Sequence, residues 1–304
     1  MTDRTTDNTA IIDATTTRNE ILRVENLSLW IKKGADEIQI LHNASFSIKD
    51  GERWGIAGES GAGKSMMMHT VAALLPNGST RTEGAILYRL KDGSWQNLFD
   101  IPYAKRHEFV SKRVAFIFQD SIHALNPNER IRKQWAATAK LHHPGITDEE
   151  CEEHLLERMD TFAIPGGMGT LGSYPHQLSG GMRQRIAIAM ALESQSKAGA
   201  YEPSVRNGII VADEPTTSLD SISQRSVVDY IEYICDKGGK TLLYVSHNLG
   251  ILQHLCDNLM VMKDGVIIEQ GRADDLFFRA RESYTKAIVR ETLNVMGKTS
   301  GGMS

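Results

Sequence analysis

Apolar runs of strand length alternate with segments of helical periodicity along most of the chain, which is the pattern of an α/β protein. Two long runs at 22–31 and 38–48 come first, and the short run 53–57 follows a turn. Further strands are predicted at 84–90, 114–118, 208–213, 241–245, 258–263 and 266–270, the last two as a hairpin. Because 114–118 is almost wholly apolar, we expect it to be a central strand.

A helical region interrupts the strands between about 120 and 190, and it predicts an inserted subdomain that rotates relative to the core. Residues 147–150 form a capping box, and apolar residues repeat after it at helical spacing, namely Cys151, Leu155, Met159 and Phe162. We expect a main domain at 20–280 after a disordered tail at 1–19. A C-terminal helix and a flexible end complete 281–304.

Composition and charge limit the function classes. The chain has 304 residues, of which 41% are hydrophobic and 24% charged, as in globular proteins. Its apolar runs are far shorter than the ~20 residues of a membrane helix, and its N-terminus lacks a secretion pattern. A net charge of -4 predicts no nucleic-acid partner, and three separated cysteines predict reduced, buried thiols. Most of the ten histidines, including His142 and His143, are expected at the surface.

The turn after strand 53–57 matches the phosphate-binding pattern G-x-x-x-x-G-K-[ST], and a helix from Met66 follows it. The turn consists of Gly58, Glu59, Ser60, Gly61, Ala62, Gly63, Lys64 and Ser65. Such a turn leaves backbone N–H groups at a positive helix end, where polyphosphate binds. We expect Lys64 to reach the β- and γ-phosphates and Ser65 to bind Mg²⁺. A chance glycine turn is the disfavoured alternative.

A second glycine-rich helix start precedes the apolar segment 186–192. It consists of Leu178, Ser179, Gly180 and Gly181. With a hydroxyl and free N–H groups it is a second candidate for anion binding, although an ordinary helix cap has the same composition. One nucleotide hardly needs two such sites.

Several polar residues are predicted to follow neighbouring strands. Asp213 and Glu214 end a buried strand, where ligands bind in open α/β sheets. Asp213 is placed to hold Mg²⁺ and Glu214 to polarise a water. We expect His247 to lie beside Glu214, while Gln119 ends the strand 114–118. Trp30 is a candidate for stacking on adenine, and a core or surface tryptophan is equally compatible with its position.

In their order, these motifs resemble the ATP-binding subunits of ABC transporters over roughly residues 22–293. The resemblance adds a D-loop at Ser218, Leu219 and Asp220. It implies an ABC ATPase fold: a P-loop NTPase core of the RecA type, an N-terminal antiparallel β subdomain and an inserted helical subdomain. Within this superfamily the short sequence motifs around Gln119, Asp213 and Tyr284 resemble those of oligopeptide, dipeptide and nickel importer ATPases. At three positions the residue differs from the one usual in those importers, namely Ser121, Asn248 and Ser283.

The resemblance also implies roles and partners. Glu214 would activate water, His247 would contact the γ-phosphate, and Ser65 with Gln119 would complete the Mg²⁺ shell. ATP held by one P-loop would be capped by the signature residues of a second ATPase subunit, for which we favour a heterodimer. Two integral-membrane permease subunits would hold the chain at the cytoplasmic face of the membrane, and an extracytoplasmic binding protein would act indirectly.

Other readings stay open at this point. The cargo could be a peptide, nickel or a metal–chelator complex. A different class of function is a non-transport ABC ATPase that acts on ribosomes or DNA, although such proteins usually carry two cassettes. A regulatory subunit that binds nucleotide without hydrolysis is a third reading, which Glu214 and His247 disfavour.

Overall fold

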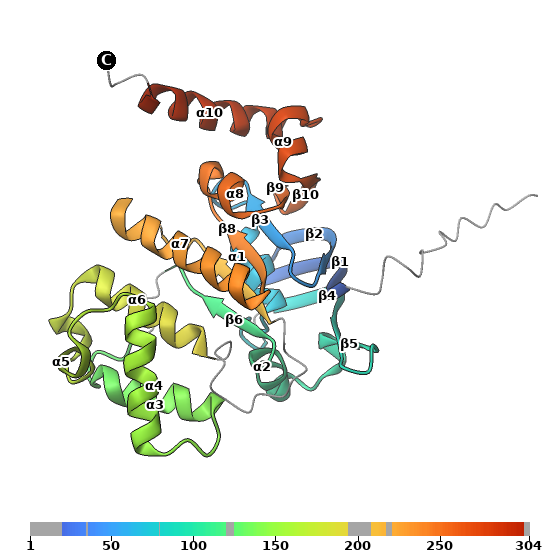
Figure 1. Ribbon diagram of the computed structural model, residues 1–304. Coiled ribbons are helices and arrows are strands. Elements are labelled where there is room, and N and C mark those ends of the chain that lie inside the picture. Colours follow the sequence, from blue (N-terminus) through green and yellow to red (C-terminus); the bar gives the residue numbers. More distant parts are fainter. Residues whose placement is uncertain are drawn as a thin grey trace, which may run out of the picture.

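The computed structural model describes residues 20–300 apart from 35, 79, 120–124, 194–207 and 217–220. The tail 1–19, the D-loop, Ser121 and the last four residues therefore lie outside the described residues. Figure 1 shows two β-sheets against each other, a group of helices on one side, and two further helices beyond the central sheet.

The N-terminal sheet is antiparallel, with the strand order β2-β1-β4-β5. Its strands are β1 (Glu20–Lys33), β2 (Asp36–Lys49), β4 (Thr80–Arg89) and β5 (Trp95–Asn97). A turn of 3₁₀-helix, η2 (Leu98–Asp100), and helix α2 (Tyr103–Ser111) follow it. Both predicted long runs are confirmed, and their inward residues, such as Leu22 and Leu29, are fully buried.

The second sheet is the core of the molecule and has the order β10-β9-β3-β8-β7-β6. All its neighbours are parallel except β10, which pairs antiparallel with β9. The strands are β3 (Arg53–Ala57), β6 (Val114–Ile117), β7 (Ile209–Asp213), β8 (Thr241–Val245), β9 (Asn258–Lys263) and β10 (Val266–Arg272). The mixed α/β core that the sequence predicts is confirmed.

Successive residues of the core strands belong to two different hydrophobic clusters. In β7, Val211 packs with helix α1 (Lys64–Val71) and the antiparallel sheet, whereas Ala212 packs with the helices on the opposite face. These opposite-face helices include α7 (Ser221–Gly238) and α8 (Leu249–Leu255). Because both faces are covered, all five residues of β7 are buried.

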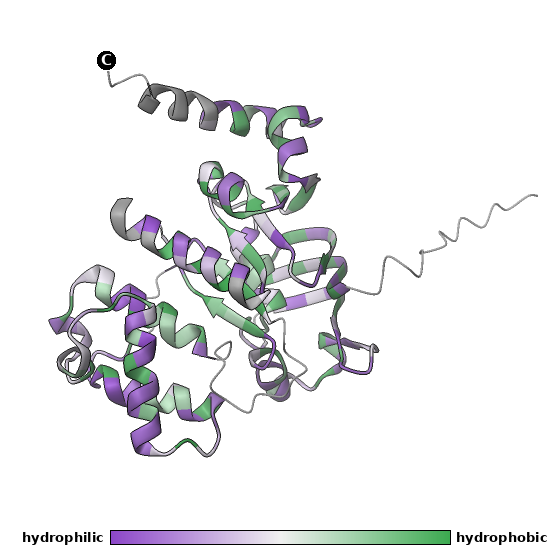
Figure 2. Ribbon diagram, viewed as in Figure 1, coloured by the Kyte–Doolittle hydropathy of each residue, from purple (hydrophilic) through white to green (hydrophobic). Residues whose placement is uncertain are grey.

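Strand β6 is at the edge of the sheet, so the prediction of a central position for this segment was wrong. Figure 2 shows β6 as an almost continuously hydrophobic arrow. Val114 packs with Val110 of α2 on one face, while Ala115 and Ile117 join the cluster around α6 on the other. A strand covered on both faces is apolar whether or not it has two neighbours, and hydropathy alone does not distinguish these cases.

The helical group comprises α3 (Ile131–His142), α4 (Asp148–Thr161), α5 (Gly167–Leu171), the short η4 (Pro175–Gln177) and α6 (Gly180–Ala191). The predicted capping box is present: Thr147 accepts from the Glu150 amide, and the Glu150 carboxylate accepts from the Thr147 amide. The predicted apolar face of α4 is buried. The chain passes from β6 into these helices and returns to the sheet at β7.

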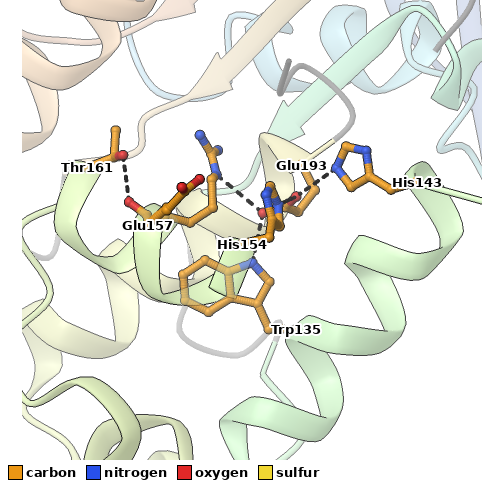
Figure 3. A network of polar contacts seen from close by, with 7 residues as sticks. Trp135, His143, His154, Glu157, Thr161 and Glu193 are labelled. Atoms are coloured by element: carbon orange, nitrogen blue, oxygen red, sulfur yellow. Dashed lines mark hydrogen bonds and ion pairs between the residues drawn. The ribbon is translucent and has the colours of Figure 1, made fainter. Parts of the chain in front are cut away.

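His143 corrects a second prediction, because it is buried, not at the surface. Its Nε2 lies 3.4 Å from Glu193 Oε2, which His154 Nε2 also approaches to 2.9 Å (Figure 3). The other carboxylate oxygen accepts from Trp135 Nε1 at 2.9 Å and Arg158 Nε at 3.3 Å. Burial alone would raise the pKa of Glu193, but the His154 hydrogen bond and the Arg158 charge lower it.

These contacts tie α3 and α4 to the end of α6. Histidine and glutamate are also metal ligands, and the ligand atoms of His143, His154 and Glu193 lie within 4.8 Å of one another. The Arg158 guanidinium already balances the carboxylate, however, and a divalent cation would face that positive charge. The geometry therefore favours a hydrogen-bonded structural network over a metal site.

The C-terminal part begins with the predicted hairpin of β9 and β10. Its turn contains Asp264 and Gly265, both with positive φ. Helices α9 (Ala273–Arg279) and α10 (Ser283–Ser300) follow and lie beyond this edge of the sheet (Figure 1). The Glu269 carboxylate on β10 accepts from the Arg281 amide at 2.7 Å, just before α10, so the start of α10 is fixed to the hairpin.

Candidate nucleotide-binding site

The glycine-rich turn between β3 and α1 is shaped by its neighbours. Gly58, Gly61 and Gly63 have φ values of 145, 84 and 94°. A Cβ atom on Gly58 would lie 2.3 Å from the Met262 carbonyl oxygen, far inside contact distance. The turn therefore rests directly on β9, and a glycine is required at its first position.

Lys64 and Ser65 begin α1 and face the turn and the strand ends. The buried Lys64 ammonium donates to the carbonyl oxygens of Gly58 at 2.8 Å and Glu59 at 2.7 Å. Burial lowers the pKa of Lys64, and the nearby carboxylates, first that of Glu214, oppose this shift. The Ser65 hydroxyl donates to Asp213 Oδ1 at 2.9 Å, which links the P-loop helix to β7.

Two carboxylates lie at the end of β7, as expected: Asp213 is its last residue and Glu214 follows it. Asp213 is 3% exposed, and burial raises its pKa against the opposing effect of the Ser65 hydrogen bond. Glu214 has φ 44°, a left-handed conformation that is strained for a residue with a side chain. Its amide donates to the Val245 carbonyl at 3.0 Å, and this bond fixes the turn against β8.

The expected proximity of His247 to Glu214 is confirmed. Strand β8 pairs with β7, and His247 Nδ1 lies 3.2 Å from Glu214 Oε2. Gln119 follows β6, whose Ile117 pairs with Ala212, so Gln119 and Asp213 lie at the same edge of the sheet. Gln119 and the His247 side chain are exposed.

The second glycine-rich segment starts helix α6, as predicted. Ser179 is the N-cap, and its Oγ accepts from the Met182 amide at 3.3 Å. A Cβ atom on Gly180 would meet nothing within 4 Å, so the backbone is open on that side. Leu178 is half-buried before the cap. Helix α6 packs with α3 and α4, while α1 packs with the central sheet, so the two helix starts belong to different layers.

Trp30 lies on β1 and is half-buried. The Arg81 guanidinium carbon is 3.6 Å from the centroid of its ring, which places a cation over one ring face. Adenine stacking on Trp30 stays a prediction, and it would need the other face or a shift of Arg81.

Sequence reasoning missed three residues at this site. His69 Nε2 lies 3.7 Å from Asp213 Oδ2, and its position four residues after Ser65 on α1 is a signal that could have identified it. The buried Gln184 of α6 donates to the Pro215 carbonyl, and Tyr284 of α10 accepts from the Glu59 amide at 3.0 Å. No local pattern identifies these last two contacts.

The residues present fit a magnesium nucleotide. A hydroxyl and a buried carboxylate, Ser65 and Asp213, are oxygen ligands of the kind that Mg²⁺ prefers. The Lys64 ammonium is held at the turn, where it would supply a positive charge to the phosphates, and the tight approach of Gly58 to β9 leaves no room for a side chain there. This combination of turn, lysine and strand-end carboxylates defines a P-loop nucleoside triphosphatase.

A comparison with protein families narrows this class. The family described as "ABC transporter" matches residues 41–217, so the chain belongs to the ABC transporter family and is an ABC-type ATPase. Among the described residues, each helix is too short or too polar to cross a bilayer.

Relatives and solved structures agree with this assignment. A probable peptide ABC transporter ATP-binding protein of Sinorhizobium fredii is 34% identical over 270 residues, 88% of this chain and 76% of that protein. The dipeptide transport ATP-binding protein DppD of Bacillus subtilis is 33% identical over 271 residues, 89% of this chain and 76% of that protein. A dimeric bacterial ABC transporter cassette superposes with a TM-score of 0.68 at 25% identity, covering 83% of this chain and 99% of that chain. The expected resemblance to peptide importer ATPases and the expected fold are confirmed.

Proposed function

We propose that this ATPase powers an importer of peptides. The observation that supports the cargo is the likeness, over 88% and 89% of the chain, to ATP-binding proteins named for peptide and dipeptide transport. Nickel and metal–chelator complexes, which the family resemblance also suggested, receive no specific support from these names.

The contacts at the site support separate roles for its residues. Glu214 would take the proton of the attacking water, and His247, 3.2 Å from it, would orient the carboxylate and contact the γ-phosphate. Lys64 and the amides of the turn would bind the phosphates. Ser65, Asp213 and Gln119 would hold Mg²⁺, which would neutralise phosphate charge when bound.

A second ATPase subunit would complete each site. The capped start of α6 has an open backbone at Gly180 and lies in a different layer from the P-loop, which supports binding of its N–H groups to ATP held by a partner subunit. ABC cassettes dimerise, as in the bacterial cassette compared above. We favour a heterodimer here, since the resembling importers commonly combine two different ATPases.

The membrane partners would bind the helical group. In this proposal α3–α6 and the segment after Gln119 dock onto two integral-membrane permease subunits at the cytoplasmic face, and an extracytoplasmic binding protein delivers the peptide. Closure of the ATPase dimer would then be coupled to the permeases through movement of the helical group.

The role of Glu214 is tested by Glu214→Gln. Removal of a general base costs on the order of 10²–10⁴ in rate, or about 3–5 kcal/mol of barrier. ATP turnover should fall by that factor while ATP binding, measured by equilibrium titration, is retained. Glu232→Gln on α7 is the matched control and should turn over normally. A Glu214→Gln enzyme with parental turnover would refute the assignment.

Three further measurements test the assembly and the cargo. ATP should bring Ser179 of one subunit within crosslinking distance of the partner subunit's Lys64. Co-purification with integral membrane proteins would support the transporter, whereas co-sedimentation with ribosomes would support the non-transport alternative. In the reconstituted complex, peptide with its binding protein should stimulate ATP turnover, and stimulation by nickel alone would overturn the peptide assignment.

A further inference from the structure

The tail segment around Tyr284 has no role in the function proposed so far. Its residues begin α10, more than two hundred positions after the P-loop, yet the Tyr284 hydroxyl accepts a hydrogen bond of 3.0 Å from the Glu59 amide. The neighbouring Thr285 is fully buried. The contact therefore joins a well-anchored helix to the phosphate-binding turn.

The Glu59 amide and the Gly58 carbonyl belong to one peptide unit. In a trans peptide these two groups point in opposite directions from the same plane. The carbonyl oxygen accepts from the Lys64 ammonium at 2.8 Å, while the N–H donates to Tyr284. Tyr284 and the phosphate-binding lysine thus hold opposite sides of one peptide plane, and a flip of that plane would break both contacts.

The hairpin before α10 supports the same turn at two other points. The Gly265 amide donates to the Ala62 carbonyl at 3.2 Å, and the Met262 carbonyl is the atom that a Cβ on Gly58 would meet. The Lys263 ammonium lies 5.1 Å from the centroid of the Tyr284 ring, which holds the ring over this hairpin. The start of α10 and the hairpin together contact the P-loop at Gly58, Glu59 and Ala62.

We propose that Tyr284 is a positioning residue for ATP binding, whose hydroxyl fixes the 58–59 peptide so that Lys64 and the turn are preorganised for the phosphates. The inference concerns nucleotide affinity and does not depend on the proposed peptide cargo. Preorganisation increases affinity because fewer backbone states are lost when the ligand binds.

The test is Tyr284→Phe in the full chain, which removes the hydroxyl and keeps the ring over Lys263. A neutral hydrogen bond contributes a factor of about 2–10 in an equilibrium, so the Kd and KM for ATP should rise by about that factor. The kcat should stay within about twofold, because the same bond is present before and during hydrolysis. Tyr233→Phe on the exposed side of α7 is the matched hydroxyl deletion and should leave KM unchanged.

Amide hydrogen exchange supplies a direct readout. The Glu59 amide should exchange faster in Tyr284→Phe. The thermal midpoint without nucleotide should fall by no more than about 3 °C, the effect of one hydrogen bond at a half-buried residue. A purely structural role would instead lower the midpoint and kcat while KM stayed constant, and that result would overturn the proposal. Lys64→Ala provides the reference for a disabled site. If Tyr284→Phe bound ATP normally while Lys64→Ala lost affinity, the role of Tyr284 would be refuted and the role of the P-loop would stand.

Discussion

The close approach of the P-loop to β9 allows a quantitative test with Gly58→Ala. The new Cβ atom would lie 2.3 Å from the Met262 carbonyl oxygen, a backbone atom of a buried strand that cannot rotate away. Overpacking costs about 1–3 kcal/mol, and a side chain at φ 145° costs a further ~1–3 kcal/mol. We therefore expect a loss of about 2–6 kcal/mol in the free energy of unfolding.

Gly61→Ala separates the two contributions. Gly61 also has positive φ, at 84°, but a Cβ there would meet nothing within 4 Å. Only the conformational cost of ~1–3 kcal/mol applies to it. In thermal unfolding, with about 2 °C per kcal/mol for a chain of this size, Gly58→Ala should melt several degrees below Gly61→Ala. Equal melting temperatures would show that the contact with Met262 does not constrain the turn.

Three further predictions concern the helical group. Burial lowers the pKa of His143; the Glu193 charge opposes this shift, and the charges of His154 and Arg158 add to it. The unfolded chain, with a histidine pKa near 6.5, therefore gains this proton at a higher pH than the folded chain does. The unfolding free energy should thus decrease from pH 7 to 5.5, and urea titrations should show a smaller decrease in His143→Gln. Trp135→Phe removes one donor to the buried Glu193 and should cost about 1–3 kcal/mol in the same assay. Ser179→Ala removes the cap of α6 and should cost about 1 kcal/mol in urea, besides weakening ATP-dependent dimerisation on a sizing column.

The elements that sequence reasoning predicted are those with local causes. The turn at Gly58 is specified by spacing, β7 by a continuous apolar run that ends in Asp213, and the start of α4 by Thr147 and its capping partner. Each of these signals lies within a few residues of the feature that it predicts. The proximity of His247 to Glu214 was also predicted, because each residue lies within two positions of the end of a core strand.

The features that sequence reasoning missed depend on residues that lie far apart in the chain. The edge position of β6 is decided by strand order, and the hydropathy of this strand reports only that both faces are covered. His143 is buried with its Nε2 3.4 Å from Oε2 of Glu193, fifty residues later, and no helical period indicates this contact. The contact of Tyr284 with Glu59 spans 225 positions. Asn248, one of the three residues that differ from the importer pattern, has a local explanation. Its side chain accepts from the Gly250 amide and caps α8.

The backbone conformation of Glu214 has a consequence for the balance between the stability of this protein and its activity. A glycine would adopt φ 44° without penalty, whereas a glutamate adopts it only because the bond from its amide to Val245 and the surrounding sheet hold it there. The chain thus keeps a strained residue at a turn where a carboxylate lies beside a histidine. We expect substitutions that relieve the strain at this turn to increase the stability of the fold and to decrease the ATPase activity.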